Sequence, residues 1–359
     1  MVPKINICIT CVGGRLIYDV IRAIRDAKDY KPFIIGIDSN KNAHGRLLCD
    51  SFFTVPHSEI DPKAWLSKIK KINSTFDIDI LLVFSEGETI LIAKNIKLLK
   101  DCNIKVAVNA YKIVKTLTDK LLLLTSLKEK GLEVGKFFDI NSKQDVINSA
   151  KLLNYPQKKI VLKPRNGRGS RGVLIANSRK KKFTNLIPER FCGTGNLDCI
   201  FKQCIKKNIK FRSLICTPFY EGRVWDVDVL AHEGKIINIA ARERQLKNPL
   251  WPTSTGHKSS NNKKVIDYVQ DICSLLKLSG PNDFDIVIDK LGNPKVLDAA
   301  SRFSGSVGVS NIAGVNMLSQ LIRYILKIPY KRFIFKENLI LRPYITMVPI
   351  PKNNELDYL

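Results

Sequence analysis

The segment best suited to chemistry is the basic, glycine-rich run KPRNGRGSRG at residues 163–172. It follows the apolar run Ile160–Leu162, which the pattern predicts as a strand. Its glycines permit positive φ and a close approach to a ligand, and successive backbone N–H groups in such a loop can bind an anion. Lys163 and the arginines add positive charge and forked donors suited to phosphate. A triphosphate is therefore the natural ligand, and a solvated basic turn is the alternative.

Two aspartates on a predicted hairpin form the second candidate group. Residues 284–289 (FDIVID) alternate with a period of two, and the turn KLGN leads into a second strand, KVLDAA. This turn brings Asp285 and Asp298 to neighbouring positions, where two carboxylates repel each other unless a cation lies between them. Mg²⁺ takes oxygen ligands and often uses one or two carboxylates with substrate phosphates. Arg302 follows within reach of a phosphoryl group, and two exposed surface aspartates are the alternative.

These groups need a scaffold, and the first 110 residues predict a parallel sheet. Stretches of helical periodicity alternate with predicted strands at Ile5–Thr10, Pro32–Asp38, Phe52–Val55, Ile78–Phe84 and Lys105–Val108. Strands that alternate with helices indicate a doubly wound α/β domain. Gly13 and Gly14 open the first helix, but the pattern G-x-G-x-x-G is missing. An NAD(P)-dependent enzyme is therefore a poor interpretation.

The remainder of the chain predicts antiparallel sheet with helices. Helices are expected on both sides of Thr118-Asp119-Lys120, near 142–153 and at 263–278, and mostly over 307–328. Strands are expected near 133–140 and at 213–217, 225–231, 235–241, 283–289 and 295–299. The turn HEGK at 232–235 joins two of these as a hairpin. Residues 184–210 carry weak signals and are expected to be irregular, and His257 is expected in an exposed polar loop.

Composition limits the class of protein. The chain has 359 residues, 45% of them hydrophobic, which suffices for two or more domains of about 150 residues. Its net charge is +26, but the lysines are scattered among Ile and Asn. We therefore attribute the charge to a lysine-rich composition rather than to nucleic-acid binding, and we expect it to attract anionic substrates.

A cytoplasmic protein is expected. The sequence contains no run of about 18 apolar residues that would predict a membrane helix. The start, MVPKINIC, enters a strand directly, without the pattern of a signal peptide. Nine irregularly spaced cysteines fit reduced thiols. If the chain self-associates, a homodimer is the expected form, because dimers are common among symmetric oligomers.

In their order and spacing these motifs resemble an ATP-grasp enzyme of the group related to the large subunit of carbamoyl-phosphate synthase. The sequence TDK at 118–120 resembles the helix start that supplies a first nucleotide-binding lysine. VLKP at 161–164 and the glycine-rich loop resemble the second lysine and the phosphate lid. EGRVWDVDV at 221–229 resembles the segment after the adenine hinge, and residues 280–305 resemble the metal hairpin. The resemblance covers nearly the whole chain.

The resemblance implies an α/β and α+β protein with a nucleotide between two lobes. A Rossmann-like parallel sheet, the pre-ATP-grasp domain, would precede a two-lobed ATP-grasp fold. The implied parts are the pre-ATP-grasp domain at 1–112, a nucleotide-binding N-terminal lobe at 113–217, a C-terminal lobe with the metal hairpin at 218–333 and an extension at 334–359. SEGE at 85–88 would face the acceptor substrate, and ordinary helix-capping acids are the alternative.

The resemblance also implies a role for each candidate residue. The nucleotide, ATP, would be held by Lys120, Lys163, Arg165, Gly167, Gly169, Ser170, Gly172, Thr217 and Phe219. Mg²⁺, or Mn²⁺ in its place, would be held by Asp285 and Asp298, and the transferring phosphoryl group would be stabilised by Arg302 and by Arg242 or Arg244. The implied reaction phosphorylates a small-molecule carboxylate to an acyl phosphate, which an amine or a thiol then attacks. Such chemistry needs positioning and charge neutralisation rather than a protein nucleophile.

Two positions and the hinge depart from the family pattern, and Ala300 and Val224 support a second hypothesis. Ala300 stands where the family's E-x-N-P-R carries a metal-bridging asparagine, and Val224 stands where a glutamate precedes an aromatic residue. Thr217-Pro218 replaces the common Gln-Glu of the hinge. The alternative is a catalytically weak ATP-grasp module that binds nucleotide as a sensor or partner subunit. The first hypothesis is a carboxylate–amine ligase, because the two lysines, the loop, the hairpin aspartates and Arg302 are intact.

Overall fold

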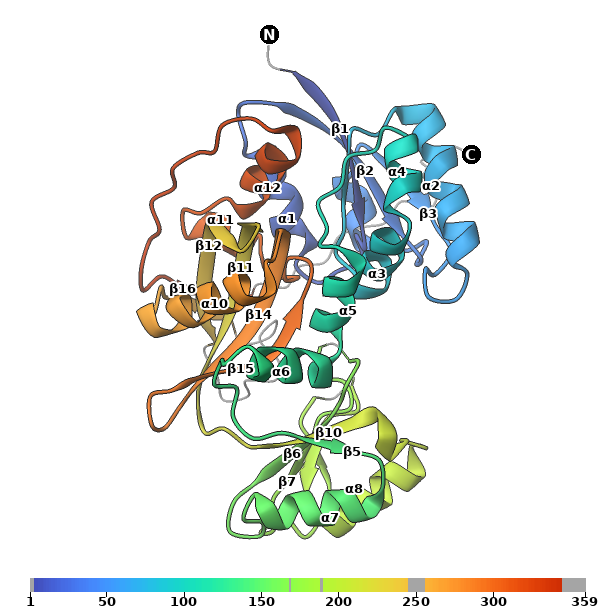
Figure 1. Ribbon diagram of the computed structural model, residues 1–359. Helices are drawn as coiled ribbons and strands as arrows, with labels where there is room; N and C mark the ends of the chain where they lie inside the picture. The colour runs from blue at the N-terminus through green and yellow to red at the C-terminus, as the bar shows by residue number, and fades with distance from the viewer. Residues whose placement is uncertain (1–2, 168, 188–189, 245–255, 344–359) are drawn as a thin grey trace.

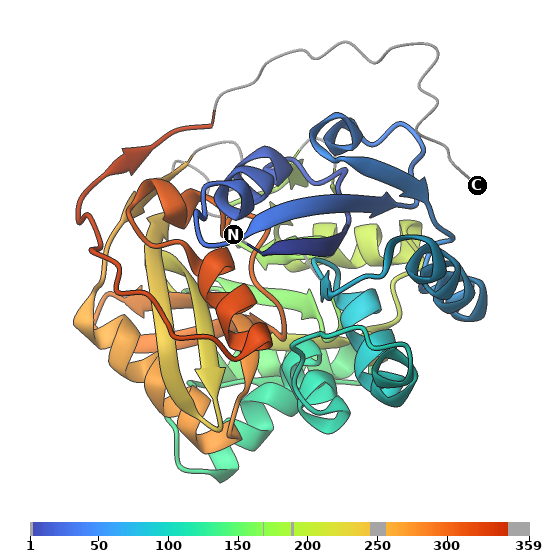
Figure 2. The same ribbon diagram turned by 90° about the horizontal axis from the view of Figure 1, so that it is seen from above.

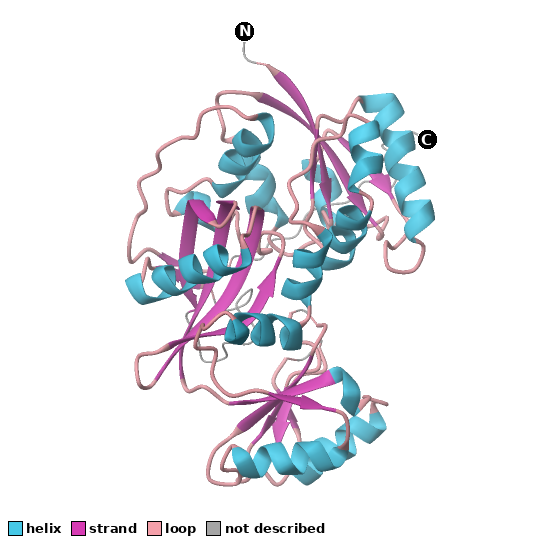
Figure 3. Cartoon of the chain, in the orientation of Figure 1, coloured by secondary structure: helices cyan, strands magenta, loops and turns pink. Residues whose placement is uncertain are grey.

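Three β-sheets organise the protein in the computed structural model, which describes residues 3–167, 169–187, 190–244 and 256–343. The first sheet is parallel and belongs to the N-terminal part of the chain. The second lies in a separate lobe, drawn at the bottom of Figure 1, and the third forms the long antiparallel sheet between them. Figure 3 shows that helices flank each sheet.

The N-terminal sheet has four parallel strands in the order β3-β2-β1-β4. Its strands are β1 (Lys4–Thr10), β2 (Lys31–Asp38), β3 (Ser51–Thr54) and β4 (Ile80–Leu82). Its helical segments are α1 (Ile17–Arg25), η1 (His44–Leu48), α2 (Pro62–Phe76), α3 (Glu86–Lys94) and α4 (Ile96–Asp101). Ile7 and Ile9 pack on the side of α1, whereas Cys8 packs on the side of α2, so both faces are buried. The predicted α/β domain is confirmed, but Lys105 forms only a single bridge to β4 rather than the expected strand.

The second sheet has six short strands in the order β5-β10-β6-β7-β9-β8. They are β5 (Phe138–Ile140), β6 (Ile160–Pro164), β7 (Leu174–Ala176), β8 (Thr184–Asn185), β9 (Gly193–Gly195) and β10 (Leu214–Pro218). Helices α7 (Lys143–Leu152) and α8 (Leu197–Lys206) share one core with these strands, and η2 (Phe211–Ser213) precedes β10. The irregular structure predicted for 184–210 was wrong, because the segment forms the ten-residue helix α8 and the strands β8 and β9. The two strands have only two or three residues, too few for a period to appear in the sequence.

The third sheet is antiparallel, with the order β15-β14-β11-β12-β13-β16. Its strands are β11 (Gly222–His232), β12 (Lys235–Arg244), β13 (His257–Ser259), β14 (Gly280–Asp289), β15 (Pro294–Ala300) and β16 (Ile340–Leu341). Both predicted hairpins, β11–β12 and β14–β15, are formed. Helix α10 (Lys263–Leu276) covers one face, and α11 (Val309–Ile312) and α12 (Met317–Leu326) follow β15 in the chain. Figure 2 shows β16 along the outer edge of this sheet, where it pairs with β13.

Two helices connect the N-terminal sheet to the second sheet and pack against the third. Helix α5 (Tyr111–Thr118) is followed directly by α6 (Lys120–Glu129), whose buried leucines belong to the core of the third sheet. The helix thereby holds Lys120, its first residue, close to β15. The predicted domain boundaries stay a prediction, and residues 344–359 of the predicted C-terminal extension lie outside the described residues.

The N-terminal sheet and the third sheet share a core. Leu230 of β11 and Leu321 of α12 pack in the same cluster as Ile7 and Val20. Asn109, buried between the parts, donates hydrogen bonds of 2.8 Å to Asn282 Oδ1 and Ser301 Oγ. In the described part of the chain, no helix is long and apolar enough to cross a membrane.

Candidate active site

Two lysines extend to the hairpin β14–β15, one from the lobe of the second sheet and one from the connecting helix α6. Asp119 caps α6 by accepting from Leu121 N, which fixes Lys120 at the helix start. The Nζ of Lys120 lies 2.9 Å from Asp298 Oδ1 and donates to Gly167 O at 2.7 Å. Lys163, the fourth residue of β6, donates to Leu297 O at 2.8 Å. The structure therefore brings both lysines to β15, and their predicted role at the phosphates stays a prediction.

Lys163 has an altered acidity in this setting. The residue is buried, and burial together with the charge of Lys120 lowers the pKa of its ammonium to about 8. The carboxylates of Asp298 and Asp285 act in the opposite direction. The ammonium of Lys163 can therefore lose its proton at mildly basic pH, and an anion bound beside it would favour the protonated form again.

The glycine-rich loop joins β6 to β7 and has an unusual backbone. Gly169, Ser170 and Gly172 have φ values of +60°, +62° and +78°. A Cβ atom at position 172 would lie 2.6 Å from Pro164 Cγ, so only glycine fits there without movement. The carbonyl of Gly167 accepts from Lys120 and that of Gly169 accepts from Arg190 Nη1 at 2.6 Å. These contacts hold the loop over the start of α6.

Three other residues that were predicted to contact the nucleotide interact with protein groups in the structure. Arg165 forms an ion pair of 2.8 Å with Asp119, which places its guanidinium at the cap of α6. Thr217 is buried in β10, opposite Val161. The backbone N–H of Phe219 donates to Lys159 O at 3.1 Å, and the Lys159 ammonium lies 5.0 Å from its ring centroid. The adenine contacts at Thr217 and Phe219 stay predictions.

The hairpin places its two predicted aspartates opposite each other. Asp285 pairs in register with Asp298 on β15 and with Asp226 on β11. Its Oδ1 lies 2.6 Å from Arg244 Nη2. Burial is the main cause that raises the pKa of Asp285 to about 7, and the neighbouring carboxylates act in the same direction. When Asp285 is ionised, its negative charge is partly compensated by the neighbouring Arg244.

Asp283 is a candidate that the sequence analysis missed. It faces the same side of β14 as Asp285 and lies opposite Ala300, the position that lacks the family's asparagine. Its Oδ1 is buried without a hydrogen-bond partner among the described residues. Burial, and then the charge of Asp228, hold the pKa of Asp283 well above its ordinary value. The signal was present, because the period of two that selects Asp285 also selects Asp283.

The carboxylates fit a hard cation that shares its coordination with phosphate. Within the described residues, no group of three or more His, Cys, Asp and Glu side chains could hold a metal ion by itself. Asp283 offers an unpartnered oxygen, and the side chain of Asp298 is 33% exposed. Two carboxylates completed by phosphate oxygens form a donor set that suits Mg²⁺. Asp283 therefore joins the predicted ligands Asp285 and Asp298 as a candidate for this role. Each of the three carboxylates also meets a basic side chain, Arg302, Arg244 or Lys120.

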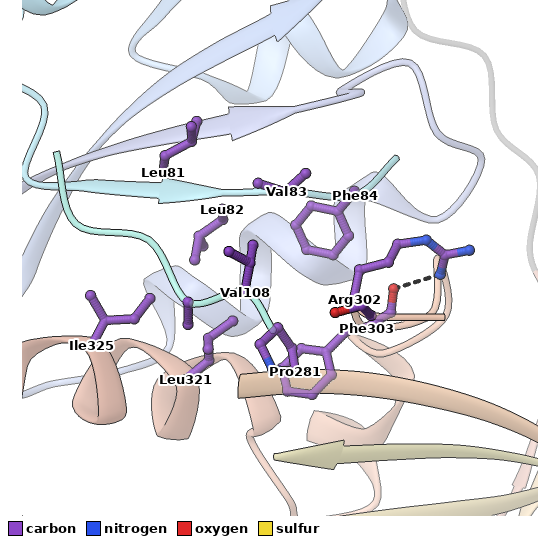
Figure 4. Close-up of a pocket in the computed structure, with 12 residues that line it drawn as sticks. Leu81, Leu82, Val83, Phe84, Val108, Pro281, Arg302, Phe303, Leu321 and Ile325 are labelled. Carbon is purple, nitrogen blue, oxygen red and sulfur yellow. Dashed lines mark hydrogen bonds between the residues drawn. The ribbon is translucent and has the colours of Figure 1, made fainter. Parts of the chain in front are cut away.

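Arg302 connects the hairpin with the N-terminal sheet. Its guanidinium lies 3.3 Å from Glu86 Oε1 and 3.4 Å from Asp283 Oδ2, and it donates to the carbonyl of Phe303. Figure 4 shows Arg302 at one end of a small pocket lined mainly by apolar side chains of both parts. The lining residues Leu82, Phe84, Pro281, Leu321 and Ile325 show that this pocket is a packing seam rather than the polar site.

Arg244 lies between two carboxylates, with a histidine behind them. Its Nε donates to Asp226 Oδ1 at 2.7 Å, and its Nη2 faces Asp285. His257 Nε2 lies 2.6 Å from the other oxygen of Asp226. The expectation that His257 lies in an exposed loop was wrong, because strand β13 pairs with β12 and buries the ring. Arg244 is thereby oriented at the edge of the hairpin.

Arg242 departs from its predicted role at the phosphoryl group. Its side chain is fully buried and lies 2.6 Å from Asp228, which is equally buried. It also donates to the hydroxyls of Ser304 and Ser306, at 3.0 and 3.3 Å, and to Ser310. Because it is enclosed by β11 and the loop after β15, Arg242 holds these segments together and does not reach the site.

Comparisons with known proteins agree with this architecture. Residues 210–341 match the protein family described as "ATP-grasp in the biosynthetic pathway with Ter operon". This match covers the third sheet, including the hairpin and Arg302. No curated protein matches the chain at a significant level.

Solved structures resemble most of the chain at low sequence identity. N5-carboxyaminoimidazole synthetase from Staphylococcus aureus, complexed with ADP, has a TM-score of 0.66 and 14% identity, covering 92% of this chain and 80% of that one. Biotin carboxylase from Campylobacter jejuni has a TM-score of 0.65 and 14% identity, covering 92% and 73%. L-amino acid ligase from Bacillus licheniformis has a TM-score of 0.62 and 14% identity, covering 90% and 74%. These similarities show that the chain shares the fold of the three solved structures, and residues 210–341 match a family of ATP-grasp proteins.

Proposed function

We propose that this protein is an ATP- and Mg²⁺-dependent ligase that activates a carboxylate as an acyl phosphate and joins it to an amine. The observation that carries the proposal is the convergence of Lys120 and Lys163 on the hairpin that bears Asp298 and Asp283. Arg302 adds a positive charge where the hairpin meets the N-terminal sheet. The names of proteins with the same fold, an L-amino acid ligase and a carboxyaminoimidazole synthetase, support carbon–nitrogen bond formation.

Binding of ATP between the lobes would use groups that already face one another. Lys120 would exchange Asp298 for phosphate oxygens, and Lys163 would gain a partner that keeps it protonated. The loop of Gly169 and Gly172 would close over the phosphates through its backbone N–H groups. Mg²⁺, held by the hairpin aspartates, would neutralise charge on the phosphate oxygens. When Lys120 binds the phosphates, its ion pair with Asp298 would break, and Asp298 would become available to hold Mg²⁺.

Phosphoryl transfer would then depend on position and charge. A carboxylate oxygen of the substrate would attack the γ-phosphorus of ATP, and ADP would leave. Arg302, fixed by Glu86 and Asp283, would stabilise the charge on the transferring group, and Arg244 would approach from the other side of the hairpin. The amine would next attack the acyl carbon, and phosphate would leave with the bridging oxygen while the amine loses a proton.

The test is ADP release from ATP and Mg²⁺ with pooled amino acids and small carboxylic acids as substrates. We expect release that depends on a carboxylate and an amine, and a loss of at least about 100-fold in Lys163→Met because a phosphate contact is removed. Lys71→Met changes an exposed lysine of α2 and should behave as wild type. Tight ATP binding without ADP release for any pool would contradict the ligase and favour the nucleotide sensor.

A further inference from the structure

The positive charge of the chain is concentrated in the lobe of the second sheet. Residues 136–218, which contain the whole second sheet, hold 19 Lys and Arg but only four Asp and Glu, a net charge of +15. The other 276 residues share the remaining +11. An even, composition-driven spread, which the sequence analysis assumed, would give this lobe about +6, in proportion to its length. The lobe therefore carries more than half of the net charge in less than a quarter of the residues.

Most of this charge lies at the surface. Among the described residues of the lobe the exposed cationic side chains are Lys136, Lys143, Lys151, Lys158, Arg171, Arg179, Lys180, Lys181, Lys182, Lys202, Lys206, Lys207, Lys210 and Arg212. Only Asp139 and Asp198 are exposed acids there. We call these exposed cations of residues 136–218 the basic surface.

Contacts show that the helical part of the basic surface is continuous. The Lys143 ammonium of α7 lies 4.8 Å from the ring centroid of Phe201 in α8, so the two helices are adjacent. The loop with Lys180 and Lys181 touches the start of α8, where Lys180 O accepts from Asn196 N at 2.8 Å. Figure 1 shows α7 and α8 together on the lower lobe, away from the other two sheets. Two helices and a loop thus present one basic face.

The basic surface also reaches the glycine-rich loop between β6 and β7. Lys207, at the end of α8, lies 5.9 Å from the ring centroid of Phe191. The carbonyl of Phe191 accepts from the N–H of Gly172, and Arg171 beside it is exposed. A polyanion bound along α8 would therefore end at the mouth of the nucleotide site, where substrate is activated.

We propose that the basic surface docks an acidic polypeptide, and that this polypeptide carries the carboxylate which the enzyme activates. This inference rests on the proposed ligase function, since a ligase of this class needs a carboxylate and an acidic polypeptide supplies many. Nucleic acid offers phosphate but no carboxylate. In the described part of the lobe the exposed large apolar residues are Leu152 and Ile205, which are aliphatic, whereas single-stranded nucleic acid uses aromatic platforms.

The binding test uses a fluorescently labelled octaglutamate peptide and the full chain, with anisotropy read at low and high salt. The variant Lys202→Glu/Lys206→Glu/Lys210→Glu changes three exposed lysines of α8 and the turn after it. Lys63→Glu/Lys70→Glu/Lys71→Glu makes the same charge change on α2 and is the matched control. We expect binding that weakens with salt and falls about tenfold or more in the α8 variant, with little change in the α2 variant.

Three results would overturn the docking surface. Equal loss in both triple variants would mean that only net charge matters. Tighter binding of a 12-nucleotide single-stranded DNA than of octaglutamate would identify a nucleic-acid surface. The absence of octaglutamate binding at low salt would end the proposal. Thermal unfolding of both variants checks that each is folded, so loss of structure is separated from loss of docking.

Turnover separates this proposal from the ligase itself. With ATP, Mg²⁺ and an amine pool, octaglutamate should support ADP release at a lower KM than free glutamate, and the α8 variant should raise that KM with kcat unchanged. Equal KM values for the two substrates would contradict the inference while leaving the ligase intact. If neither of these substrates nor any other carboxylate supports ADP release, the proposed function is contradicted. The anisotropy result would then stand by itself.

Discussion

Raising the pH through the pKa of Lys163 should weaken ATP binding. Burial and the charge of Lys120 lower this pKa to about 8, so the free protein loses the ammonium charge as the pH rises above that value. If ATP binds only the protonated form, the protonated fraction sets the apparent affinity. That fraction falls from roughly three quarters at pH 7.5 to roughly a tenth at pH 9, and the affinity should fall about eightfold.

Calorimetry from pH 7.5 to 9.5, at constant ionic strength and without Mg²⁺, measures this effect. Asp285, with a pKa of about 7, is already roughly three quarters ionised at pH 7.5, so its contribution over this range should be small beside that of Lys163. Lys163→Arg keeps a positive charge at all these pH values and should give a flat profile, which makes it the control. A flat wild-type profile, or the same inflection in Lys163→Arg, would refute the assignment of Lys163 to the phosphates.

Other predictions test single contacts. Asp283→Asn should lower ATP affinity about 10-fold or more in the presence of Mg²⁺ but not in its absence, as measured by calorimetry, and an equal effect without Mg²⁺ would contradict its role as a ligand. Arg242→Met should cost roughly 3–5 kcal/mol in urea unfolding, because buried Asp228 loses its partner; a cost under about 1 kcal/mol would contradict this. Gly172→Ala should weaken ATP binding several-fold, since φ is +78° and Pro164 is too close. Gly167→Ala has more space and no positive φ, so a comparable loss there would disprove the backbone argument.

Sequence patterns predicted most of the elements that are long enough to show a hydrophobic period. Strands β1, β2 and β4 of the N-terminal sheet and the hairpins β11–β12 and β14–β15 were expected because apolar runs or alternation extend over about six or more residues. Strands β8 and β9 have two and three residues, and neither period nor propensity can identify so short an element. The single bridge at Lys105 replaced an expected strand because its apolar neighbours pack in a core cluster without a strand partner.

The site was predicted in part, because a sequence gives the type of a side chain but not its partner. The neighbouring positions of Asp285 and Asp298 follow from the turn length, and the structure shows this register. The enclosure of Arg242 depends on serines about 60 residues later, which no local pattern relates to it. The partners of the hairpin aspartates likewise come from outside their own strand, since Arg244 approaches Asp285 from β12 and Arg302 approaches Asp283 from the segment after β15.

The central claim is that ATP activates a carboxylate through an acyl phosphate. Transfer of ¹⁸O tests it most directly, with ATP, Mg²⁺, an amine pool and carboxylates labelled with ¹⁸O. If a carboxylate oxygen attacks the γ-phosphorus and the acyl carbon is then attacked by an amine, the released phosphate carries one ¹⁸O atom. ADP release with unlabelled phosphate would mean that water is the attacking group, and it would contradict the ligase mechanism.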